Sequence, residues 1–353
     1  MGKVLNWAVA GTGWIATDMA EILKEHGRGF YGVASGHVEN ARHYAEKYQV
    51  PRVYETIEQL CADPAVDVVY VATPHNTHFE IAKKALTAGK HCLIEKSITL
   101  NSRELEELVA IANEQQLCIA EAMTTWHMPV MKELKILVDS GILGRVQVIN
   151  VNFGSMKPYD MENRFFNLKY AGGALLDIGV YALSAIRLFL EEKPTEVLSQ
   201  WKLCQAGSDE EETILLKNAA GQMAAAVVSL HSKQPKRAMI SCEKGFIEIM
   251  EYPRAKRAEI TFADTGEKQI LELGDPKDAL YYEVQDFEAV VRQWAAACEA
   301  AGERAAECTE DAPERDAMNQ RMGAMQLQYT RENMEVMTEL RKQWNMKYPG
   351  EVW

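Results

Sequence analysis

The first 122 residues alternate short apolar runs with segments in which apolar residues recur every three or four positions. The runs are typical of buried strands, and the recurrence is typical of amphipathic helices. Strands are predicted over residues 4–10, 30–34, 66–72, 91–95 and 118–122, and helices from residue 15 and over 40–48, 77–88 and 101–115. This alternation predicts an α/β domain with a doubly wound parallel sheet, covered by helices on both faces.

The rhythm changes beyond residue 123, where most apolar runs follow one another without an intervening helix. A helix is predicted over 129–140, and strands over 145–153, 196–203, 213–217, 223–230, 239–242, 246–250 and 259–262. Strands that follow strands predict an antiparallel sheet and an α+β domain. We therefore predict two domains, residues 1–122 and 123–353, which suits a chain of 353 residues.

Two long helical patterns end the chain, over residues 281–300 and about 313–344. The second is rich in methionine, which indicates a packing face. The acidic stretch between them, residues 303–314, is predicted to be a solvated loop.

Composition narrows the classes of function. The chain has 51 acidic and 38 basic residues, and a formal charge of -13 disfavours nucleic acids and anionic membranes as partners. Its seven cysteines show no metal-like spacing, so we expect reduced thiols and a cytoplasmic protein. A strand pattern begins almost at the N-terminus, so we expect no signal peptide, and we expect no membrane-spanning stretch.

A glycine turn, Gly11-x-Gly13-x-x-Ala16, joins the first predicted strand to the first helix. Gly11 permits a turn too sharp for a Cβ atom, and Gly13 lets the backbone approach a pyrophosphate. The first amides of the helix, at Trp14 and Ile15, would then face the phosphates. The motif alone fits an ordinary turn equally well, but its place between a strand and a helix favours a dinucleotide site.

Three predicted strands end in polar residues, and ligands of this fold lie beyond the carboxyl ends of the strands. The candidates for nucleotide binding there are Thr73, Pro74, His75, Asn76, His78, Glu95 and Lys96, and the last strand ends in Glu121. Alternatively, Thr73 or Asn76 caps the next helix and each histidine is satisfied within the fold, which we favour for either histidine taken singly. The charged residues Glu95 and Lys96 must either pair with each other or serve the function of the site, because an unpaired buried charge is costly.

A second polar constellation lies in the segment GGALLDIGVYA, residues 172–182. As a helix it aligns Asp177, Tyr181 and Ser184 on one side. In the structural alternative, Asp177 complements the helix dipole and Tyr181 is a half-buried anchor. A phenol near the Lys96 ammonium would have a lowered pKa, and it could exchange a proton with a substrate oxygen while a nicotinamide carries the hydride.

Four segments together resemble the Gfo/Idh/MocA family of pyridine-nucleotide oxidoreductases, in particular its branch of dihydrodiol and xylose dehydrogenases. They are AGTGWIA, DVVYVATPHNTHFEIAKKALTAGKHCLIEKS, EAMTTWHMP and GGALLDIGVYALS. The resemblance implies a Rossmann domain, then a domain with a large open antiparallel sheet often used for oligomerisation, here in a homodimer or homotetramer. It also implies that Tyr181 is the acid/base, that Lys96 tunes it and orients the substrate hydroxyl, that Asp177 supports them, and that Trp126 lines the substrate site.

Two departures from the family pattern affect these expectations. The family usually reads Glu-Lys-Pro, and Ser97 replaces the proline, which leaves the turn free to take another shape. NAD-specific domains commonly have an acid at the end of the second strand, where this chain reads ASGH, residues 34–37. Because Ser35 and His37 could receive a 2′-phosphate, we expect NADP as the cofactor, with NAD as the alternative.

The leading hypothesis is a dehydrogenase that acts on a secondary alcohol, or its ketone, in a sugar, a sugar derivative or a cyclic diol, without a metal. Residues 157–170 are expected to cover the substrate, with Arg164 either contacting it or forming a surface ion pair with Asp160 or Glu162. Two alternatives remain open. One is a non-catalytic nucleotide- and sugar-binding regulator, and the other is a glycoside-processing enzyme that recycles a tightly bound NAD.

Overall fold

The computed structural model describes residues 4–301 and 321–353, so the predicted acidic loop lies outside the described residues. The chain divides into two compact units. Unit 1 comprises Met1–Ile98, Arg103–Ala122 and Leu280–Gln328, and unit 2 comprises Thr99–Ser102, Met123–Ala279 and Tyr329–Trp353.

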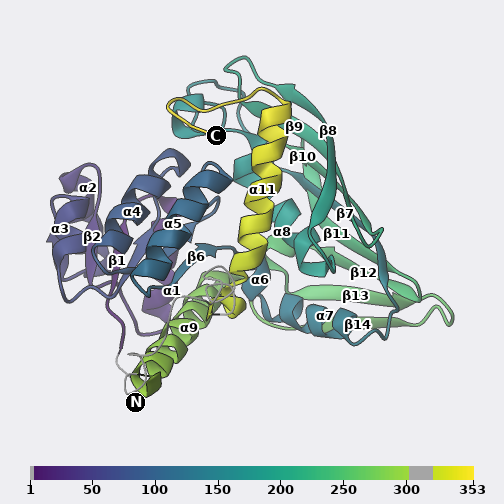
Figure 1. Ribbon diagram of the computed structural model, residues 1–353, viewed down its shortest axis with the longest axis horizontal. Helices are drawn as coiled ribbons and strands as arrows, with labels where there is room; N and C mark the ends of the chain where they lie inside the picture. The colour runs from purple at the N-terminus through teal and green to yellow at the C-terminus, as the bar shows by residue number, and fades with distance from the viewer. Residues whose placement is uncertain (1–3, 302–320) are drawn as a thin grey trace. The chain divides into compact units, whose positions relative to one another are not determined.

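Unit 1 contains a six-stranded parallel sheet in the order β3-β2-β1-β4-β5-β6 (Figure 1). The strands are β1 Trp7–Ala10, β2 Gly32–Ala34, β3 Arg52–Tyr54, β4 Val68–Val71, β5 His91–Glu95 and β6 Ile119–Ala122. The helices between them are α1 Trp14–Glu25, α2 Val38–Tyr48, α3 Ile57–Ala62, α4 His78–Thr87 and α5 Ser102–Glu114. Every residue of β1 and β4 is buried. The doubly wound class is confirmed, and its strand order reverses between β1 and β4, where ligands of this fold bind.

The two units differ from the predicted domains at two places: Thr99–Ser102 belongs to unit 2, and helix α9, Ala279–Ala301, lies almost wholly in unit 1. The Trp7 indole N–H on β1 donates to Glu288 on α9, at 2.8 Å, and the Trp7 ring packs edge-on against Phe287. A second indole N–H, that of Trp294, donates to the carbonyl of Gln116, at 2.8 Å. The late helix is therefore part of the core of the first domain.

Unit 2 is built on an eight-stranded sheet in the order β14-β13-β12-β11-β7-β10-β9-β8. The β7–β10 pair is parallel and the other pairs are antiparallel, so the mostly antiparallel sheet is confirmed. The strands are β7 Val146–Gly154, β8 Pro194–Leu203, β9 Asp209–Asn218, β10 Met223–Ser229, β11 Gln234–Cys242, β12 Gly245–Met250, β13 Arg257–Phe262 and β14 Lys268–Glu272.

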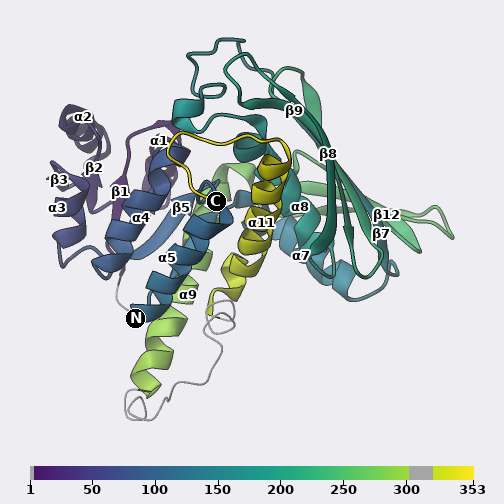
Figure 2. The same cartoon turned by 45° about the horizontal axis from the view of Figure 1, so that its top comes forward.

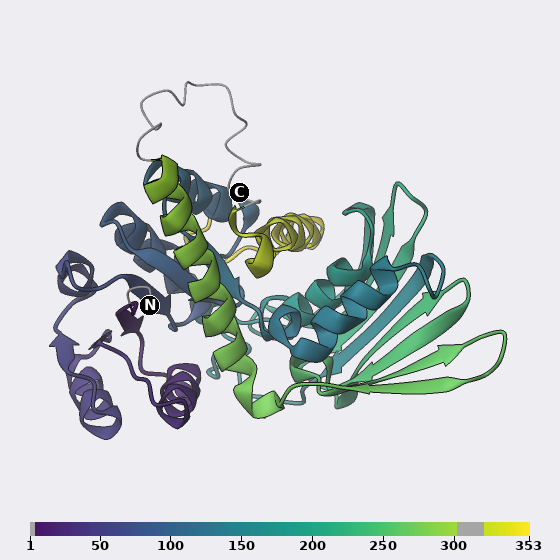
Figure 3. The same cartoon turned by 90° about the horizontal axis from the view of Figure 1, so that it is seen from below.

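Helices of unit 2 lie on one face of this sheet (Figures 2 and 3). They are α6 Thr124–His127, α7 Pro129–Asp139, α8 Val180–Phe189 and most of α11, Leu327–Gln343. The strand register places a series of exposed apolar side chains together on the opposite face: Leu198, Leu215, Met223, Phe246, Met250 and Ile270. The sheet is thus open on one side.

Four elements, β3, α3, α6 and β14, have no counterpart in the prediction, because each is too short to show a period and β3 and β14 are mostly exposed. The long helix predicted over about 313–344 begins in residues that are not described. In its described part, Gln326 takes a left-handed conformation, with a φ of +54°, just before α11. One segment, Leu168–Phe189, has the length and mean hydropathy, 1.4, of a membrane span, which the sequence pattern does not predict. Its most apolar window of 18 residues is 94% buried, and its packing within unit 2 accounts for its apolar character.

Candidate functional site

The turn after β1 has the geometry expected of a dinucleotide-binding turn. Gly11 has a φ of +114°, and a Cβ atom there would lie 2.3 Å from the carbonyl oxygen of Ala72. Gly13 is the N-cap of α1 in an extended conformation, and a Cβ there would lie 4.0 Å from the same oxygen. Helix α1 has neither a side-chain cap nor an acidic residue in its first turn, where Trp14 is 57% exposed and Ile15 half-buried. The amides of this turn therefore suit an anion such as a pyrophosphate.

Replacement by alanine is expected to lower stability at Gly11 and nucleotide affinity at Gly13. Gly11→Ala should destabilise the protein by more than about 2 kcal/mol, because its Cβ would collide with backbone. Gly13→Ala should change stability by less than about 0.5 kcal/mol and lower nucleotide affinity at least about tenfold, because its Cβ fits the protein but occupies the approach of a pyrophosphate. Thermal melts and a fluorescence titration with NADPH separate the two. Unchanged affinity in Gly13→Ala would argue against a pyrophosphate there.

The end of β2 carries the two residues expected to discriminate between the cofactors. Ser35 is half-buried, with its Oγ 3.3 Å from that of Thr12, and His37 is exposed at the N-cap of α2, where its side chain makes no capping bond. Glu39, in the first turn of α2, forms an exposed ion pair with Arg42. The roles of Ser35 and His37 stay predictions.

The turn after β5 is held by buried carboxylates from two neighbouring strands. Glu95 is 7% exposed, accepts a hydrogen bond from the Tyr70 hydroxyl on β4 and accepts another from the main-chain N–H of Lys96, at 3.3 Å. One residue beyond the turn, the N–H of Ile98 donates to Glu121 on β6, at 3.1 Å. Glu95 therefore fixes the main chain that carries Lys96, whose side chain is half-buried.

His75 and His78 brace the same turn. His75 Nε2 lies 3.0 Å from the carbonyl oxygen of Lys96, and His78 Nδ1 lies 3.0 Å from that of Ser97. The peptide bond between Lys96 and Ser97 is cis. His78 is fully buried, and burial lowers the pKa of its imidazole. The structural interpretation of both histidines is confirmed, and contact with a nucleotide stays a prediction.

Helix α4 is not capped by Thr73 or Asn76, the two residues that the structural alternative names. The N-cap of α4 is Thr77, without a side-chain cap, and its hydroxyl oxygen lies 2.7 Å from Thr73 Oγ1 and 2.8 Å from the carbonyl oxygen of Pro74. Pro74 and Asn76 are exposed at the carboxyl edge of the sheet. The capping roles of Thr73 and Asn76 are wrong, and their nucleotide contacts stay predictions.

In unit 2, Asp177 and Tyr181 lie where a π-helical turn, Leu175–Gly179, runs into α8. The π turn breaks the regular spacing assumed in the sequence prediction. Ser184 is fully buried and binds Asn333, at 3.2 Å, so it does not extend the predicted polar side. Asp177 is 9% exposed, and the half-buried Tyr181 ring lies 5.9 Å from the Phe153 ring. π turns often occur at functional sites.

Asp209, at the start of β9, holds the entry to this π turn. Its Oδ2 accepts a hydrogen bond from the N–H of Leu175, at 2.5 Å. Gly173 has a φ of +138°, and a Cβ there would lie 2.1 Å from Asp209 Oδ1, so no other residue fits. Burial raises the pKa of Asp209 to about 6, against the opposing effect of the Leu175 N–H. Four consecutive acids in a strand pattern, residues 209–212, are the only sequence signal for this support.

Glu212, on the same strand, faces the end of the π turn. It is 3% exposed, its carboxylate oxygens have no hydrogen-bond partner among the described residues, and Oε1 would lie 3.2 Å from a Cβ on Gly179. Burial raises the pKa of Glu212 well above its ordinary value, and the nearby Asp209 and Glu211 raise it further. Burial therefore favours the neutral form of this carboxyl group, which lies against the helical segment that carries Tyr181.

Glu212→Gln is expected to stabilise the protein, increasingly as the pH rises. The folded state retains the Glu212 proton above about pH 4.3, where the unfolded chain loses it, so stability falls as the pH rises toward the folded pKa. Glutamine does not ionise, and the gain should reach about 1–3 kcal/mol at pH 8. Melts between pH 5 and 8.5 test this, with the exposed Glu196→Gln as a control that stays within about 0.5 kcal/mol. A gain independent of pH would show that Glu212 is ionised in the fold.

The two predicted substrate residues differ in their surroundings. Trp126 is 2% exposed, donates its indole N–H to the carbonyl of Ser184, at 3.1 Å, and packs edge-on against Tyr329. These contacts give it a packing role in unit 2, and substrate contact stays a prediction. Arg164 lies over the Phe165 ring, 4.4 Å from its centre, and forms no ion pair with Asp160 or Glu162 in the part of the chain that is described. The surface-pair alternative is therefore wrong, while a substrate contact stays a prediction.

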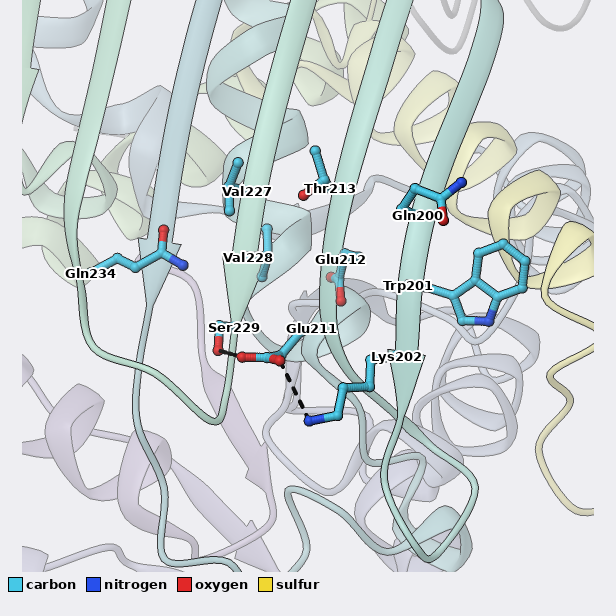
Figure 4. Close-up of a pocket in the computed structure, with 10 residues that line it drawn as sticks. All are labelled: Gln200, Trp201, Lys202, Glu211, Glu212, Thr213, Val227, Val228, Ser229 and Gln234. Carbon is cyan, nitrogen blue, oxygen red and sulfur yellow. Dashed lines mark hydrogen bonds and ion pairs between the residues drawn. The ribbon is translucent and has the colours of Figure 1, made fainter.

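A hollow of about 310 Å³ lies on β8, β9 and β10 in unit 2 (Figure 4). Glu211 on β9 accepts a hydrogen bond from Ser229, at 2.8 Å, and lies 3.6 Å from the Lys202 ammonium on β8. Trp201 is 40% exposed beside them. Within the described ranges, no three or more histidines, cysteines and acids gather as a metal site would require.

Comparison with known proteins agrees with this architecture. Residues 5–123 match the model of an oxidoreductase family with an NAD-binding Rossmann fold, and residues 131–248 match the GFO/IDH/MocA C-terminal domain. Trans-1,2-dihydrobenzene-1,2-diol dehydrogenase of Mus musculus is 30% identical over 255 residues, which cover 70% of this chain and 75% of the relative. The Xenopus laevis enzyme of the same name is 30% identical over 253 residues, or 70% of this chain and 76% of the relative.

Two solved structures share the fold over nearly the whole chain. A 3-ketoreductase from Actinomadura kijaniata, solved with NADP and TDP-benzene, superposes with a TM-score of 0.76 at 21% identity and covers 96% of this chain and 98% of its own. A UDP-N-acetylglucosamine 3-dehydrogenase from Acidithiobacillus ferrooxidans gives a TM-score of 0.70 at 20% identity, covering 94% and 99%.

The fold, the glycine turn and these matches define an NAD(P)-dependent oxidoreductase. The chain belongs to the Gfo/Idh/MocA family, as its motifs predict.

Proposed function

We propose that the chain is a dehydrogenase for the secondary alcohol, or the corresponding ketone, of a sugar, a sugar derivative or a cyclic diol. Support comes from relatives named for a cyclic diol and from fold neighbours named for sugar chemistry. The observation that carries the proposal is that the elements of three polar residues are held in place within each unit. In unit 1, Lys96 lies on a turn held by buried side chains. In unit 2, Asp177 and Tyr181 lie at a π turn whose first residue is bound by Asp209. A purely regulatory nucleotide-binding protein has no need of such a set.

Within this proposal, Tyr181 is the acid/base that exchanges a proton with the substrate oxygen. Lys96 supplies positive charge that favours the phenolate and orients the substrate hydroxyl. Asp177 is a supporting polar group, and Trp126 and Arg164 are the substrate contacts. The nicotinamide, when bound, supplies or accepts the hydride.

The cofactor proposed is NADP, held at its pyrophosphate by the Gly11–Gly13 turn and the first amides of α1. The loop of Ser35 and His37 offers a hydroxyl and an imidazole to a 2′-phosphate, and Glu39 is already paired with Arg42. NADPH should therefore bind at least about tenfold more tightly than NADH. Ser35→Asp should remove or reverse that preference, because an acid there repels a 2′-phosphate and binds ribose hydroxyls.

We also propose a homodimer or homotetramer located in the cytoplasm. The apolar side chains on the open face of the sheet in unit 2 suit contact with a second copy. The location is supported by the five cysteines whose side chains the structure describes, all of which are free thiols. Sedimentation of the wild type and Leu215→Lys tests the assembly, since an interface over this face should weaken in the variant.

The function is tested by following nicotinamide absorbance with a panel of polyols, sugars and cyclic diols. Saturable oxidation or reduction with net turnover of the nucleotide supports the proposal. Reduced nucleotide that survives purification, with substrate conversion but no net consumption, would instead show an enzyme that recycles its cofactor. Tight nucleotide binding without any conversion across the panel would favour the regulatory alternative.

A further inference from the structure

A hollow of about 610 Å³ in unit 1 has no part in the proposed reaction. Its lining comes from the segment before β1, from the loop between α1 and β2, and from one side of α9: Val4, Gly27, Arg28, Tyr281, Gln285, Glu288 and Arg292. Arg28 precedes β2, and Trp7, whose indole binds Glu288, begins β1. The hollow therefore lies at the amino end of these parallel strands, whereas the glycine turn lies at their carboxyl end.

Among the described residues that line this hollow, Glu288 is the only carboxylate, and it already accepts three hydrogen bonds. It is 3% exposed; Oε1 accepts from the Trp7 indole, at 2.8 Å, and from Arg28, and Oε2 accepts from Arg292, at 2.6 Å. One buried negative charge thus faces two guanidinium groups. The lining carries a net charge of about +1 by this count of two arginines and one glutamate.

Both guanidinium groups retain unused donors. Each carries five N–H bonds, and the described contacts of Arg28 and of Arg292 each use an Nη2 donor on Glu288. Glu288 holds the two arginines on the same carboxylate, so their free edges are fixed near each other. The exposed Gln285 amide, one turn before Glu288 on α9, adds a further polar group.

We propose that this hollow binds a phosphate group, either as inorganic phosphate or as the monoester of a small metabolite. Guanidinium groups match the geometry of phosphate oxygens, and their shared contact with the buried Glu288 keeps both side chains at the same hollow. The volume lies in the range of small-molecule pockets and exceeds that of a phosphate ion alone, which favours the monoester.

Calorimetric titration tests the site, with saturating NADP present throughout so that phosphate cannot enter the dinucleotide site. The probes are inorganic phosphate, glucose 6-phosphate and glucose, at constant ionic strength. Both phosphates should bind saturably and glucose should not. Tighter binding of glucose 6-phosphate than of phosphate would identify the monoester as the ligand, and the reverse order would identify the free ion.

Gln285→Glu is the informative variant, because it adds a negative charge to the lining without removing a partner of Glu288. It should weaken phosphate binding at least about tenfold and leave the melting temperature and the nucleotide affinity unchanged. Gln49→Glu, with the same charge change at the exposed C-cap of α2 and outside the lining, should bind phosphate like the wild type. No saturable binding, or equal affinity in both variants, would overturn the proposal and leave the arginines as counter-charges for Glu288 alone.

Discussion

Tyr181→Phe is expected to lower kcat by about 100- to 10,000-fold, the usual contribution of a positioned acid/base. The substitution removes the hydroxyl and keeps the ring that packs near Phe153, so the fold is preserved. Nucleotide affinity should stay within about twofold of the wild type, because the proposed nucleotide contacts lie in unit 1. Steady-state kinetics on the best substrate of the panel, together with a fluorescence titration, provide both measurements.

Tyr252→Phe is a matched control for this prediction. Tyr252 also packs near Phe153, with ring centres 6.2 Å apart, but it is fully buried and its hydroxyl has no hydrogen-bond partner among the described residues. Removing an unsatisfied hydroxyl should leave kcat within about twofold and stability unchanged or slightly higher. If Tyr181→Phe retained near-parental turnover, or if both variants lost activity equally, Tyr181 would not be the acid/base.

Lys96→Met should reduce kcat by about 100- to 1,000-fold, because it removes a positive charge and keeps the length of the side chain. The buried contacts that hold the turn use main-chain atoms of Lys96, so they survive the substitution. The pH profile of the residual activity should also move to higher pH, since the proposed phenol would no longer benefit from a neighbouring ammonium. The profile is measured on kcat/KM between pH 6 and 10.

Lys90, which directly precedes β5, is a control lysine with a structural role and no proposed catalytic role. Its ammonium is buried and donates to the carbonyl oxygens of Asp63, at 2.7 Å, and Val66, at 2.9 Å. Lys90→Met should therefore lower the melting temperature and leave turnover per folded molecule unchanged. A profile of Lys96→Met that does not shift, or a loss confined to KM, would contradict the electrostatic role of Lys96.

The sequence predicts the elements whose residues are buried on every side. β5 has the predicted bounds, His91–Glu95, and the strand–helix alternation indicates the parallel sheet, because such strands have no polar face. β3 and β14 are missed because most of their residues are exposed and carry no period. Helix α9 is joined to unit 1 by contacts such as the hydrogen bond between Trp7 and Glu288. These two residues are 281 positions apart, and no local sequence pattern connects them.

In the candidate site too, the sequence predicts some parts and not others. Strand ends and glycine spacing locate the turn at Gly11 and the segments that carry Lys96 and Tyr181, since backbone geometry there depends on local sequence. The supporting groups are different: no pattern shows that Glu95 binds Tyr70 or that Asp209 binds the N–H of Leu175. Those contacts arise from tertiary packing, which also turned a predicted regular helix into a π turn.

The chain passes from one unit to the other after residues 98, 102, 122, 279 and 328. The two halves of the sequence are therefore not interchangeable modules. A chimaera spliced at residue 122, with its C-terminal part from a relative, would inherit a foreign α9 and would keep the Trp7 indole and the Arg28 guanidinium only if that helix offered an acid in the place of Glu288. Exchange of substrate specificity by recombination should succeed when the graft spans residues 123–279 and leaves the late helix in place.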